Sequence, residues 1–470
     1  MKQRNTQELK TISDVVSNDY CVGCGACAYL NNETMRLNDF GCYEPELVFS
    51  ECAGVDKSVE AVCPMLNPEW DENYLSELFL DDMPFSDEIS GKYQNIFAAH
   101  VVEKDFRAKG SSGGMGSWLA TELMRLRHVD GVIHVSPRER EEWDDPFYEY
   151  RISRSEDEIR RSAHSHYHVV EISKVIAEVK ETPGNYLFVG VPCMVKAIRR
   201  LQLVDEVLRE RIVYTLGLVC GHLKSVHWSL SLGWAAGIEP DDLSAITFRE
   251  KLPGKPAKAY FFRVEDLEGN QKVVDSASCA GGKYNQGAMM PNACNYCDDV
   301  TAETADITIG DAWLPKYKYE SEGKNIVIVR SQILNALVVD AVNSGRLSAD
   351  KLSSKDVFNA QAGGFRQRRE GLAYRLNNDW RYGRMPPVKR SFANLKSPNL
   401  LRSAVYRLRQ KISVNSKYLF REALRYNRFD IYSSQINRSL KLLRTLELLL
   451  SGKKVFTDRV FGLWQRFRLR

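Results

Sequence analysis

Three cysteines, each separated from the next by two residues, could bind metal near the start of the chain. The segment CVGCGAC places three cysteines on one short loop: Cys21, Cys24 and Cys27. Thiolates at this spacing can hold three corners of a cubane iron–sulfur cluster. Gly23 and Gly25 would let the backbone curl close to such a cluster. The spacing therefore predicts an iron–sulfur loop.

The fourth ligand of this loop must come from elsewhere in the chain. A bacterial ferredoxin run would have its fourth cysteine, followed by proline, at position 31, where this chain has Asn31. Cys63 is the favoured fourth ligand because Pro64 follows it, and Cys52 is the second choice. Zinc is the main alternative, since CxxC is also half of a zinc site. Inert core cysteines are the third interpretation.

A second group of cysteines lies in the middle of the chain. Cys193 follows the predicted strand 185–191, and Cys220 follows the predicted strand 211–219. Ligands of open α/β sheets gather outside the carboxyl ends of strands. The pair in CNYC, Cys294 and Cys297, could complete a four-thiolate site there. Ordinary buried cysteines are the alternative. Two other cysteines have no partner in this scheme and are expected to be structural: Cys42 and Cys279.

A glycine- and serine-rich turn opens the first strongly helical segment. The run KGSSGGMGSWLATELM begins at Lys109, and Arg107 precedes it. Hydroxyls and N–H groups at a helix start can bind a phosphate, and both basic residues would assist. The alternative is a simple helix cap, because Ser and Gly are common there. One-electron centres need a two-electron partner to act on organic substrates, and a flavin with bound phosphates would supply one.

Alternating strand and helix patterns must position these residues. Apolar spacing predicts a helix from Met115 and a helix over 195–202, with strands at 131–135, 185–191, 211–219 and 305–313. Such alternation is typical of an α/β fold with a mostly parallel sheet.

Length and charge set further limits. The chain has 470 residues and a net charge of +4, and 470 residues suggest two or three domains. No signal peptide or spanning helix is indicated, so we expect a cytoplasmic protein. Residues 386–470 contain 20 Lys and Arg against 4 Asp and Glu, so the rest of the chain is acidic.

The basic tail has several interpretations. Its aromatic and basic C-terminus could lie on an anionic membrane surface as a peripheral contact. It could also dock on an acidic partner, whereas nothing resembles a nucleic-acid reader. The alternative is a helical extension that packs its apolar face on the body.

Six motifs occur in order along the chain: CVGCGAC with a later CP, GSSGGMGSWLATELMRLRHVDGVI, FVGVPCMVKAIRRL, LGLVCGH, ITFREK and CNYCDDVTAETADITIGDAW. With these motifs the chain resembles the family of coenzyme F420 hydrogenase/dehydrogenase beta subunits, which includes 7-hydroxymethyl chlorophyll a reductase-like proteins. The resemblance covers roughly residues 18–385.

The resemblance implies a flavin-dependent iron–sulfur oxidoreductase with FAD and two [4Fe–4S] clusters. It assigns to the first cluster Cys21, Cys24, Cys27 and Cys63, and to the second Cys193, Cys220, Cys294 and Cys297. The expected flavin contacts are Arg107, Gly110, Ser111, Ser112, Gly113, Gly114 and Tyr167. Electrons would pass between a ferredoxin-like donor or a coenzyme F420-type carrier and an organic substrate. Many family members occur in bacterial polysaccharide gene clusters, which suggests one source of that substrate. No catalytic acid or base is identified.

The chain departs from the family pattern at two places. VPC replaces the usual TPC around Cys193. The segment SAHSHYHVV replaces a stretch that often carries a Lys-Tyr pair, so Tyr167 is preceded by His166. His166 could supply a proton near physiological pH. The alternative, which we favour, is a surface histidine in a polar loop.

Together these features predict a mixed α/β protein in three parts. Residues 1–90 would be a ferredoxin-like iron–sulfur segment, residues 91–385 an α/β domain with FAD and a cluster, and residues 386–470 a basic helical extension. The alternative function is a zinc-stabilised or iron–sulfur binding or sensor module without catalysis.

Overall fold

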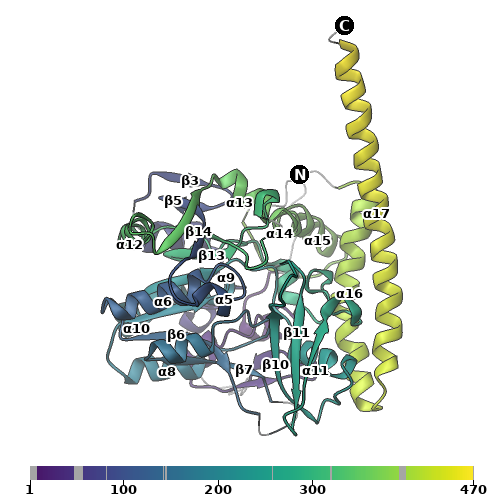
Figure 1. The fold of residues 1–470 in the computed structure, drawn as a ribbon. Helices are drawn as coiled ribbons and strands as arrows, with labels where there is room; N and C mark the ends of the chain where they lie inside the picture. The colour runs from purple at the N-terminus through teal and green to yellow at the C-terminus, as the bar shows by residue number, and fades with distance from the viewer. Residues whose placement is uncertain are drawn as a thin grey trace.

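An eight-stranded mixed sheet forms the centre of the molecule (Figure 1). The computed structural model describes residues 8–46, 57–80, 82–140, 142, 145–256, 258–317, 320–390 and 398–468. The strand order is β15-β5-β14-β13-β9-β8-β6-β7. The strands are β5 (Asn95–Val101), β6 (Gly131–Pro137), β7 (Tyr148–Ser153), β8 (Tyr186–Gly190), β9 (Ile212–Leu218), β13 (Ile307–Asp311), β14 (Asn325–Val329) and β15 (Leu347–Lys351).

The prediction of a mostly parallel sheet is wrong. Only the neighbouring strands β13, β9, β8 and β6 run parallel, and the four other pairings in the sheet are antiparallel. Among the described residues, no α-helix lies between β6 and β7 or between β13 and β14, and each of these pairs is antiparallel. The four predicted strands nevertheless coincide with β6, β8, β9 and β13, so the parallel centre was anticipated.

Helices cover both faces of this sheet. Side chains alternate between the faces along each strand, so Val132 and Leu187 pack with α6 (Met115–Arg125) while Ile133 and Phe188 pack with α9 (Pro192–Val204). The remaining helices of this region are α5 (Phe106–Lys109), α7 (Glu156–Arg161), α8 (Ser173–Glu181), α10 (Glu206–Arg211), α11 (Val226–Ala235) and α12 (Gln332–Asn343). The sequence prediction of α6 and α9 is confirmed.

Smaller elements surround the central sheet. A three-stranded antiparallel sheet contains β10 (Leu243–Glu250), β11 (Phe261–Asp266) and β12 (Gln271–Asp275). The N-terminal segment contains α1 (Ile12–Ser17), α2 (Ala26–Asn31), the pair β1 (Met35–Leu37) and β2 (Tyr43–Pro45), α3 (Lys57–Ala61), α4 (Glu72–Phe79), and the pair β3 (Phe85–Asp87) and β4 (Gly91–Tyr93). Short 3-10 helices are η1 (Ser276–Ser278), η2 (Tyr284–Gln286), η3 (Asn292–Tyr296) and η4 (Pro315–Tyr317).

The C-terminal part is helical, as expected. It contains α13 (Ser354–Ala360), α14 (Ala362–Arg368), α15 (Glu370–Arg381), α16 (Leu400–Arg425) and α17 (Phe429–Arg468). The last two form an antiparallel hairpin along the body, beyond which α17 projects (Figure 1). Phe420 and Tyr432 are fully buried against the body. The interpretation of the tail as a helical extension that packs on the body is therefore confirmed for α16 and the first part of α17.

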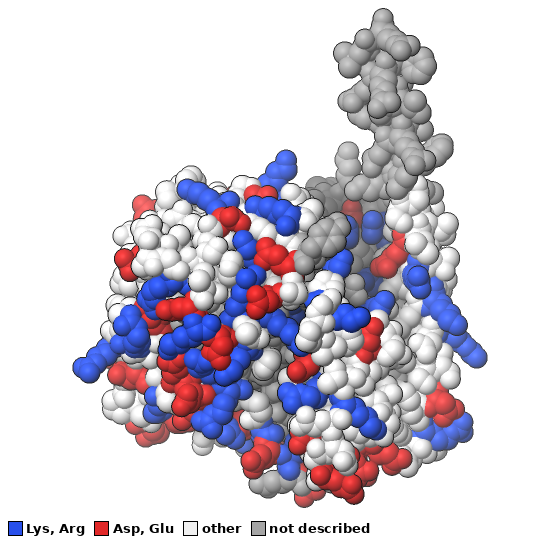
Figure 2. Space-filling view, in the orientation of Figure 1, with Lys and Arg blue, Asp and Glu red and all other residues white. Residues whose placement is uncertain are grey.

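One hydrophobic core joins the three predicted parts of the chain. It includes Cys27 from the N-terminal segment, Ile198 from α9 and Phe420 from α16. Within the described ranges, no helix is long and apolar enough to cross a membrane. Both signs of charge are interspersed over the visible face of the body in Figure 2.

Candidate metal and cofactor site

The loop between α1 and α2 carries Cys21 and Cys24, and Cys27 is the second residue of α2. Gly23 and Gly25 have φ angles of 71° and 85°, a region that glycine adopts without strain. A Cβ on Gly23 would lie 2.9 Å from the Cβ of Tyr43, so the loop curls tightly, as predicted. The N–H of Gly23 donates to Sγ of Cys21 at 3.3 Å. Asn31 is the last residue of α2.

Cys63 comes to this loop from the turn after α3. Its thiol interacts electrostatically with those of Cys21, Cys24 and Cys27. The fully buried Arg200 fixes the turn by donating to the backbone oxygens of Leu66, Asn67 and Trp70 at 2.9, 2.8 and 2.6 Å. The four thiols of the first group are thus neighbours. The second choice for fourth ligand, Cys52, lies outside the described residues.

Burial makes ionisation of these thiols unfavourable unless a positive charge lies nearby. Burial, with the neighbouring thiol of Cys63, raises the pKa of Cys24 to about 12. Burial is also the main cause that raises the pKa of Cys21 and of Cys27. A buried thiolate needs a compensating positive charge, and a metal centre would supply it while releasing the thiol protons.

The second group of thiols meets at the carboxyl ends of β8 and β9. Cys193 is the second residue of α9, directly after β8, and Cys220 follows β9. Cys294 lies in η3 and Cys297 immediately follows it. One small cavity is lined by all four of these cysteines. The N–H of Leu223 donates to Sγ of Cys294 at 3.4 Å. The four cysteines of the second group therefore come together at strand ends, as the sequence predicted.

The two thiol groups are adjacent. Val22 and Pro64, from the first group's loops, also line the cavity of the second group. The thiols of Cys24 and Cys193 interact electrostatically. Helix α9 connects both groups, because it begins beside Cys193 and carries Arg200 two turns later.

The described residues contain no cluster of three or more Cys, His, Asp or Glu side chains arranged to hold a single metal ion. A tetrahedral zinc ion with bonds of about 2.3 Å needs its thiolates within roughly 4 Å of one another.

Cys42 and Cys279 do not line the four-thiol cavity. Cys42 is buried with Sγ 3.9 Å from the carbonyl oxygen of Phe40, and Cys279 is half-buried near Asp275. Their expected structural role remains a prediction.

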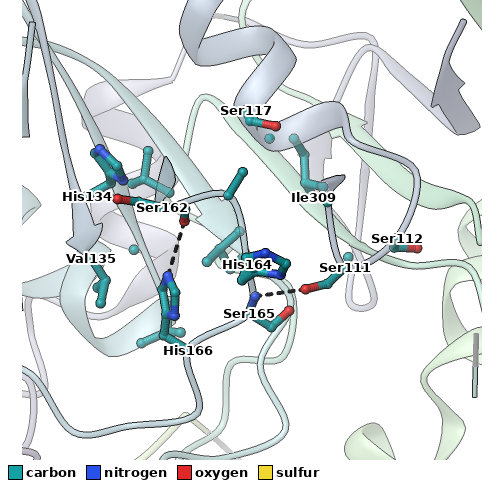
Figure 3. A pocket seen from close by; sticks show the side chains of 18 of the residues that line it. Ser111, Ser112, Ser117, His134, Val135, Ser162, His164, Ser165, His166 and Ile309 are labelled. Atoms are coloured by element: carbon teal, nitrogen blue, oxygen red, sulfur yellow. Dashed lines mark hydrogen bonds between the residues drawn. The ribbon is translucent and has the colours of Figure 1, made fainter. Parts of the chain in front are cut away.

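A larger cavity of about 290 Å³ adjoins the second thiol group (Figure 3). It lies at the carboxyl ends of the parallel strands and beside the loop that precedes α6. Its wall includes five of the residues predicted to bind a cofactor: Gly110, Ser111, Ser112, Gly114 and Tyr167. Cys220 and Leu223 line both cavities, so only their side chains and backbone separate the two spaces at this point.

The glycine–serine loop wraps one end of this cavity. Gly114 has φ of 81°, and a Cβ there would lie 2.6 Å from the backbone of Phe106. The hydroxyl of Ser112 donates to the carbonyl oxygen of Lys324 at 3.1 Å. The hydroxyl oxygen of Ser111 accepts the N–H of Ser165 at 2.8 Å, as the dashed line in Figure 3 shows. The O–H hydrogen of Ser111 is left to donate elsewhere.

Arg107 and Gly113 do not line the cavity. The Arg107 guanidinium donates instead to Glu320 at 2.7 Å and to the carbonyl oxygen of Gly323 at 2.8 Å. Gly113 packs against β5, where a Cβ would lie 2.7 Å from the carbonyl oxygen of Ala99. The sequence did not predict these contacts of Arg107 and Gly113 with residues that are distant in the chain.

Lys251 is the cation that holds the glycine–serine loop. Its Nζ donates to the carbonyl oxygens of Arg107 and Ser112 at 2.6 and 3.2 Å. Burial lowers the pKa of Lys251 to about 8. The ITFREK motif contained this residue, but its spacing alone gave no sign of a role.

An ion pair of Arg249 and Asp311 forms another wall of the cavity. Their side chains are 2.5 Å apart, and the Arg249 guanidinium stacks 5.0 Å from the ring centre of Tyr260. Arg249 has φ of 58° at an irregularity of β10, and such bulges re-aim a side chain. Burial opposes the charge of Arg249, but Asp311 together with the hydroxyls of Tyr167 and Tyr260 outweighs burial, so the pKa of the guanidinium is raised. Asp306, from the same matched motif, instead accepts from Arg199 and Thr215 inside the fold.

Aromatic rings close the side of the cavity that faces the second thiol group. The ring centre of Tyr167 lies 4.5 Å from that of Tyr284, which stacks on His222 at 4.2 Å. Burial raises the pKa of Tyr167. Sequence reasoning missed Tyr284 and His222, although the position of His222 two residues after Cys220 was a signal.

Four histidines also line this cavity: His134, His164, His166 and His168. His166 was expected to be a surface histidine or a proton donor near physiological pH; it lines this cavity, so the surface interpretation is wrong. Its Nε2 lies 3.1 Å from the carbonyl oxygen of Ser162 (Figure 3), and burial lowers its pKa to about 3. The ring is therefore neutral. Nδ1 of His164 and of His166 have no hydrogen-bond partner among the described residues.

Comparison with known proteins gives two family matches. Residues 96–177 match the N-terminal part of the coenzyme F420 hydrogenase/dehydrogenase beta subunit, and residues 184–355 match its C-terminal part. Together they cover more than half of the chain and most of the larger cavity's lining.

Two relatives show 25% identity to this chain. One is a subunit of the F(420)H(2) dehydrogenase of Methanosarcina mazei, over 332 residues that are 68% of this chain and 82% of the relative. The other is the coenzyme F420 hydrogenase subunit beta of Methanococcus voltae, over 58% of this chain and 92% of the relative. A solved structure of the F420-reducing [NiFe] hydrogenase complex from Methanosarcina barkeri, derivatised with xenon, has a chain with 19% identity and a TM-score of 0.45. The similarity covers 60% of this chain and 92% of that chain.

Proposed function

Because the chain belongs to the family of coenzyme F420 hydrogenase/dehydrogenase beta subunits, we propose that it is a flavin-dependent iron–sulfur oxidoreductase. The observation that carries the proposal is the shared wall at Cys220 and Leu223. A cavity with four thiols meets a larger cavity with aromatic and glycine-rich walls, and a one-electron centre next to a two-electron cofactor is what such an enzyme needs.

The donor sets suit two iron–sulfur clusters. Each group offers four thiols, and cubane clusters take four cysteine thiolates. Backbone N–H groups of Gly23 and Leu223 point at sulfur, which tunes a cluster. We therefore assign one [4Fe–4S] cluster to Cys21, Cys24, Cys27 and Cys63, and another to Cys193, Cys220, Cys294 and Cys297.

The larger cavity suits the ring system of a flavin such as FAD. Its volume of about 290 Å³ is close to the lower end of the roughly 300–1,000 Å³ typical of small-molecule sites. Tyr167 and Tyr284 offer flat apolar surfaces, while Nδ1 of His166 can accept a hydrogen bond. A bound flavin would supply two-electron transfer to an organic substrate.

The glycine–serine loop would hold the flavin's phosphates. Gly114 precedes the first turn of α6, where the N–H groups favour anions. Lys251 braces this loop, and the hydroxyl of Ser111 can donate. These residues take over the role that the sequence suggested for Arg107.

The order of the sites suggests the direction of the electron path. Electrons would pass from the first thiol group to the second, since Cys24 neighbours Cys193, and then past Cys220 to the larger cavity. We propose that a partner protein such as a ferredoxin exchanges electrons at the first group. The names of both relatives refer to F420, so an F420-type carrier is a candidate at the larger cavity. We also propose polysaccharide metabolism as a source of the organic substrate.

Anaerobic purification of the full chain tests this function. The absorption spectrum should show iron–sulfur and flavin bands, with about eight irons and one FAD in each chain. A colourless protein that contains zinc, without iron or flavin, would contradict the proposal and support the zinc-stabilised alternative. Clusters that dithionite reduces, but that no organic acceptor or F420-type carrier reoxidises, would favour a sensor module instead.

A further inference from the structure

Arg368 stands beside the second thiol group although it lies outside the matched family regions. It is the last residue of α14, and the C-terminal family match ends at residue 355. Its side chain lines the four-thiol cavity together with Cys220, Cys294 and Cys297. No motif in the sequence singled it out.

The Arg368 guanidinium is buried without a carboxylate. The residue is only 3% exposed, and no Asp or Glu within the described ranges forms an ion pair with it. Its Nε donor has no hydrogen-bond partner there. Its electrostatic partners are the thiols of Cys297, Cys220 and Cys294. A buried cation with an unused donor is costly unless an anion faces it.

Other cations near this cavity are already paired. Lys196 binds Glu72 at 2.9 Å, and Lys389 lies 3.9 Å from Asp298. Their charge is therefore largely balanced by neighbours. Among the described basic residues that line this cavity, Arg368 is the one without a carboxylate partner, while Lys224 also acts on Cys294 from outside the lining.

We propose that Arg368 donates to the sulfur atoms of the second [4Fe–4S] cluster and raises its reduction potential. This inference rests on the proposed function, since it requires a cluster at the second thiol group. One-electron reduction adds negative charge to the cluster, so a nearby fixed positive charge stabilises the reduced form. Net charge, hydrogen bonds to sulfur and solvent exposure are the protein's means of setting cluster potentials.

The surrounding helices hold Arg368 and the CNYC loop in a fixed relation. Nε of Arg375 donates to the carbonyl oxygen of Asn295 at 2.7 Å, and Nδ2 of Asn295 donates to Ser413 Oγ at 3.1 Å. The hydroxyl of Tyr296 binds Asp379. Helices α15 and α16 thus clamp the loop from the side on which α14 presents Arg368. The C-terminal region beyond the family match would then be part of the cluster site.

An EPR-monitored redox titration of the full-length, anaerobically purified protein tests the inference. In Arg368→Gln the ratio of reduced to oxidised second cluster should fall about tenfold at a given ambient potential, which is about 59 mV for one electron. Arg368→Lys keeps the charge and should lie between this variant and the wild type. Arg366→Gln removes an exposed charge from the same helix and should change nothing.

The outcomes separate this inference from the proposed function. An unchanged potential in Arg368→Gln, with both clusters present, would overturn the inference alone. Loss of the second cluster from both Arg368 variants, with helical content and the first cluster intact, would show a structural role and would also overturn it. A wild type that holds no cluster at the second thiol group would contradict the proposed function, and the inference would fall with it.

Discussion

The two thiol groups differ in how far apart their cysteines lie in the sequence. The first takes all four cysteines from residues 21–63, and glycine φ angles and one buried arginine fix its loops. The second collects cysteines from the ends of β8 and β9 and from η3, across about a hundred residues. The first group therefore depends on local backbone geometry, whereas the second depends on the whole sheet and on the helices that brace η3.

Their electrostatic surroundings differ as well. Carboxylates of Glu44 and Glu171 act on Cys21 and Cys24, while the guanidinium of Arg368 and the carboxylate of Asp299 act on Cys220 in the second group. Arg200 and Lys389 also act on Cys63, so the first group meets both signs of charge. The second group alone adjoins the larger cavity. We therefore expect changes at the two groups to have separable effects.

Removing one thiol from each group should give the largest effects. Cys24→Ala and Cys193→Ala are each expected to lose about half of the iron, because a cubane needs four ligands. Both variants should slow reduction of the flavin by a ferredoxin-like donor, because the proposed path passes through both groups; in Cys193→Ala the donor should still reduce the first cluster, whereas in Cys24→Ala it should reduce neither the second cluster nor the flavin. Iron analysis and stopped-flow absorbance measure both.

Cys42→Ala is the matched control, because Cys42 is buried but lines neither cavity. It should retain all iron. Loss of all iron from either ligand variant would mean that the two groups do not assemble independently.

Arg200→Met should disrupt the first group and leave the second assembled. The substitution removes donors to at least three buried backbone oxygens around Cys63 and should cost about 3–5 kcal/mol of unfolding free energy. Urea denaturation with iron analysis measures the effect. Arg209→Met, at an exposed position on α10, is the control. Equal loss of both clusters would argue that α9 itself, rather than the Cys63 turn, had collapsed.

Acid should lower the free energy of unfolding through a histidine of the larger cavity, which adjoins only the second group. Burial lowers the pKa of His168 to about 4, below about 6.5 in the unfolded chain. The unfolded state then binds more protons as the pH falls below 6.5, so stability is lost toward pH 4. At pH 5 this loss is about 2 kcal/mol for His168.

Urea denaturation between pH 8 and pH 5 tests the acid effect. His168→Gln should reduce the slope of stability against pH, whereas His128→Gln, outside the cavity, should preserve it. An unchanged slope in His168→Gln would show that this ring is already charged or exposed in the folded state.

Lys251→Gln should have the smallest effect. Weakening the brace on the glycine–serine loop is expected to lower flavin affinity about tenfold, or about 1.4 kcal/mol, with no loss of iron. Flavin fluorescence after dilution measures release. Lys258→Gln changes an exposed lysine nearby and should bind flavin normally. Loss of iron together with flavin would mean that the cavity and the thiol groups are not separable.

Local signals in the sequence were sufficient for the loops and for the parallel strands. The CVGCGAC spacing and the Cys63-Pro64 pair indicated the first group, and two buried strands each followed by a cysteine indicated the second. The antiparallel edges escaped prediction because strand direction at an edge depends on pairing partners distant in the sequence. β5, for example, pairs with β14 and β15, more than 220 residues away.

Side-chain direction was harder to predict than backbone position. Arg107 was expected at the cofactor but turns to Glu320, 213 residues later. His166 lies in a polar sequence and yet is enclosed by residues from several strands. Arg368 belongs to no motif, and only the packing of α14 against η3 brings it to the thiols. Each depends on long-range contacts that single-sequence patterns do not contain.

Helix α9 has a consequence for the speed of electron transfer. Seven residues separate Cys193 from Arg200 along the helix, a rise of about 10 Å. One end of this rod holds a ligand of the second group and the other end holds the Cys63 turn. Electron tunnelling falls steeply with distance, so a covalent spacer of fixed pitch would keep the gap between two centres constant while the rest of the molecule moves. The helix would then act as a ruler for tunnelling.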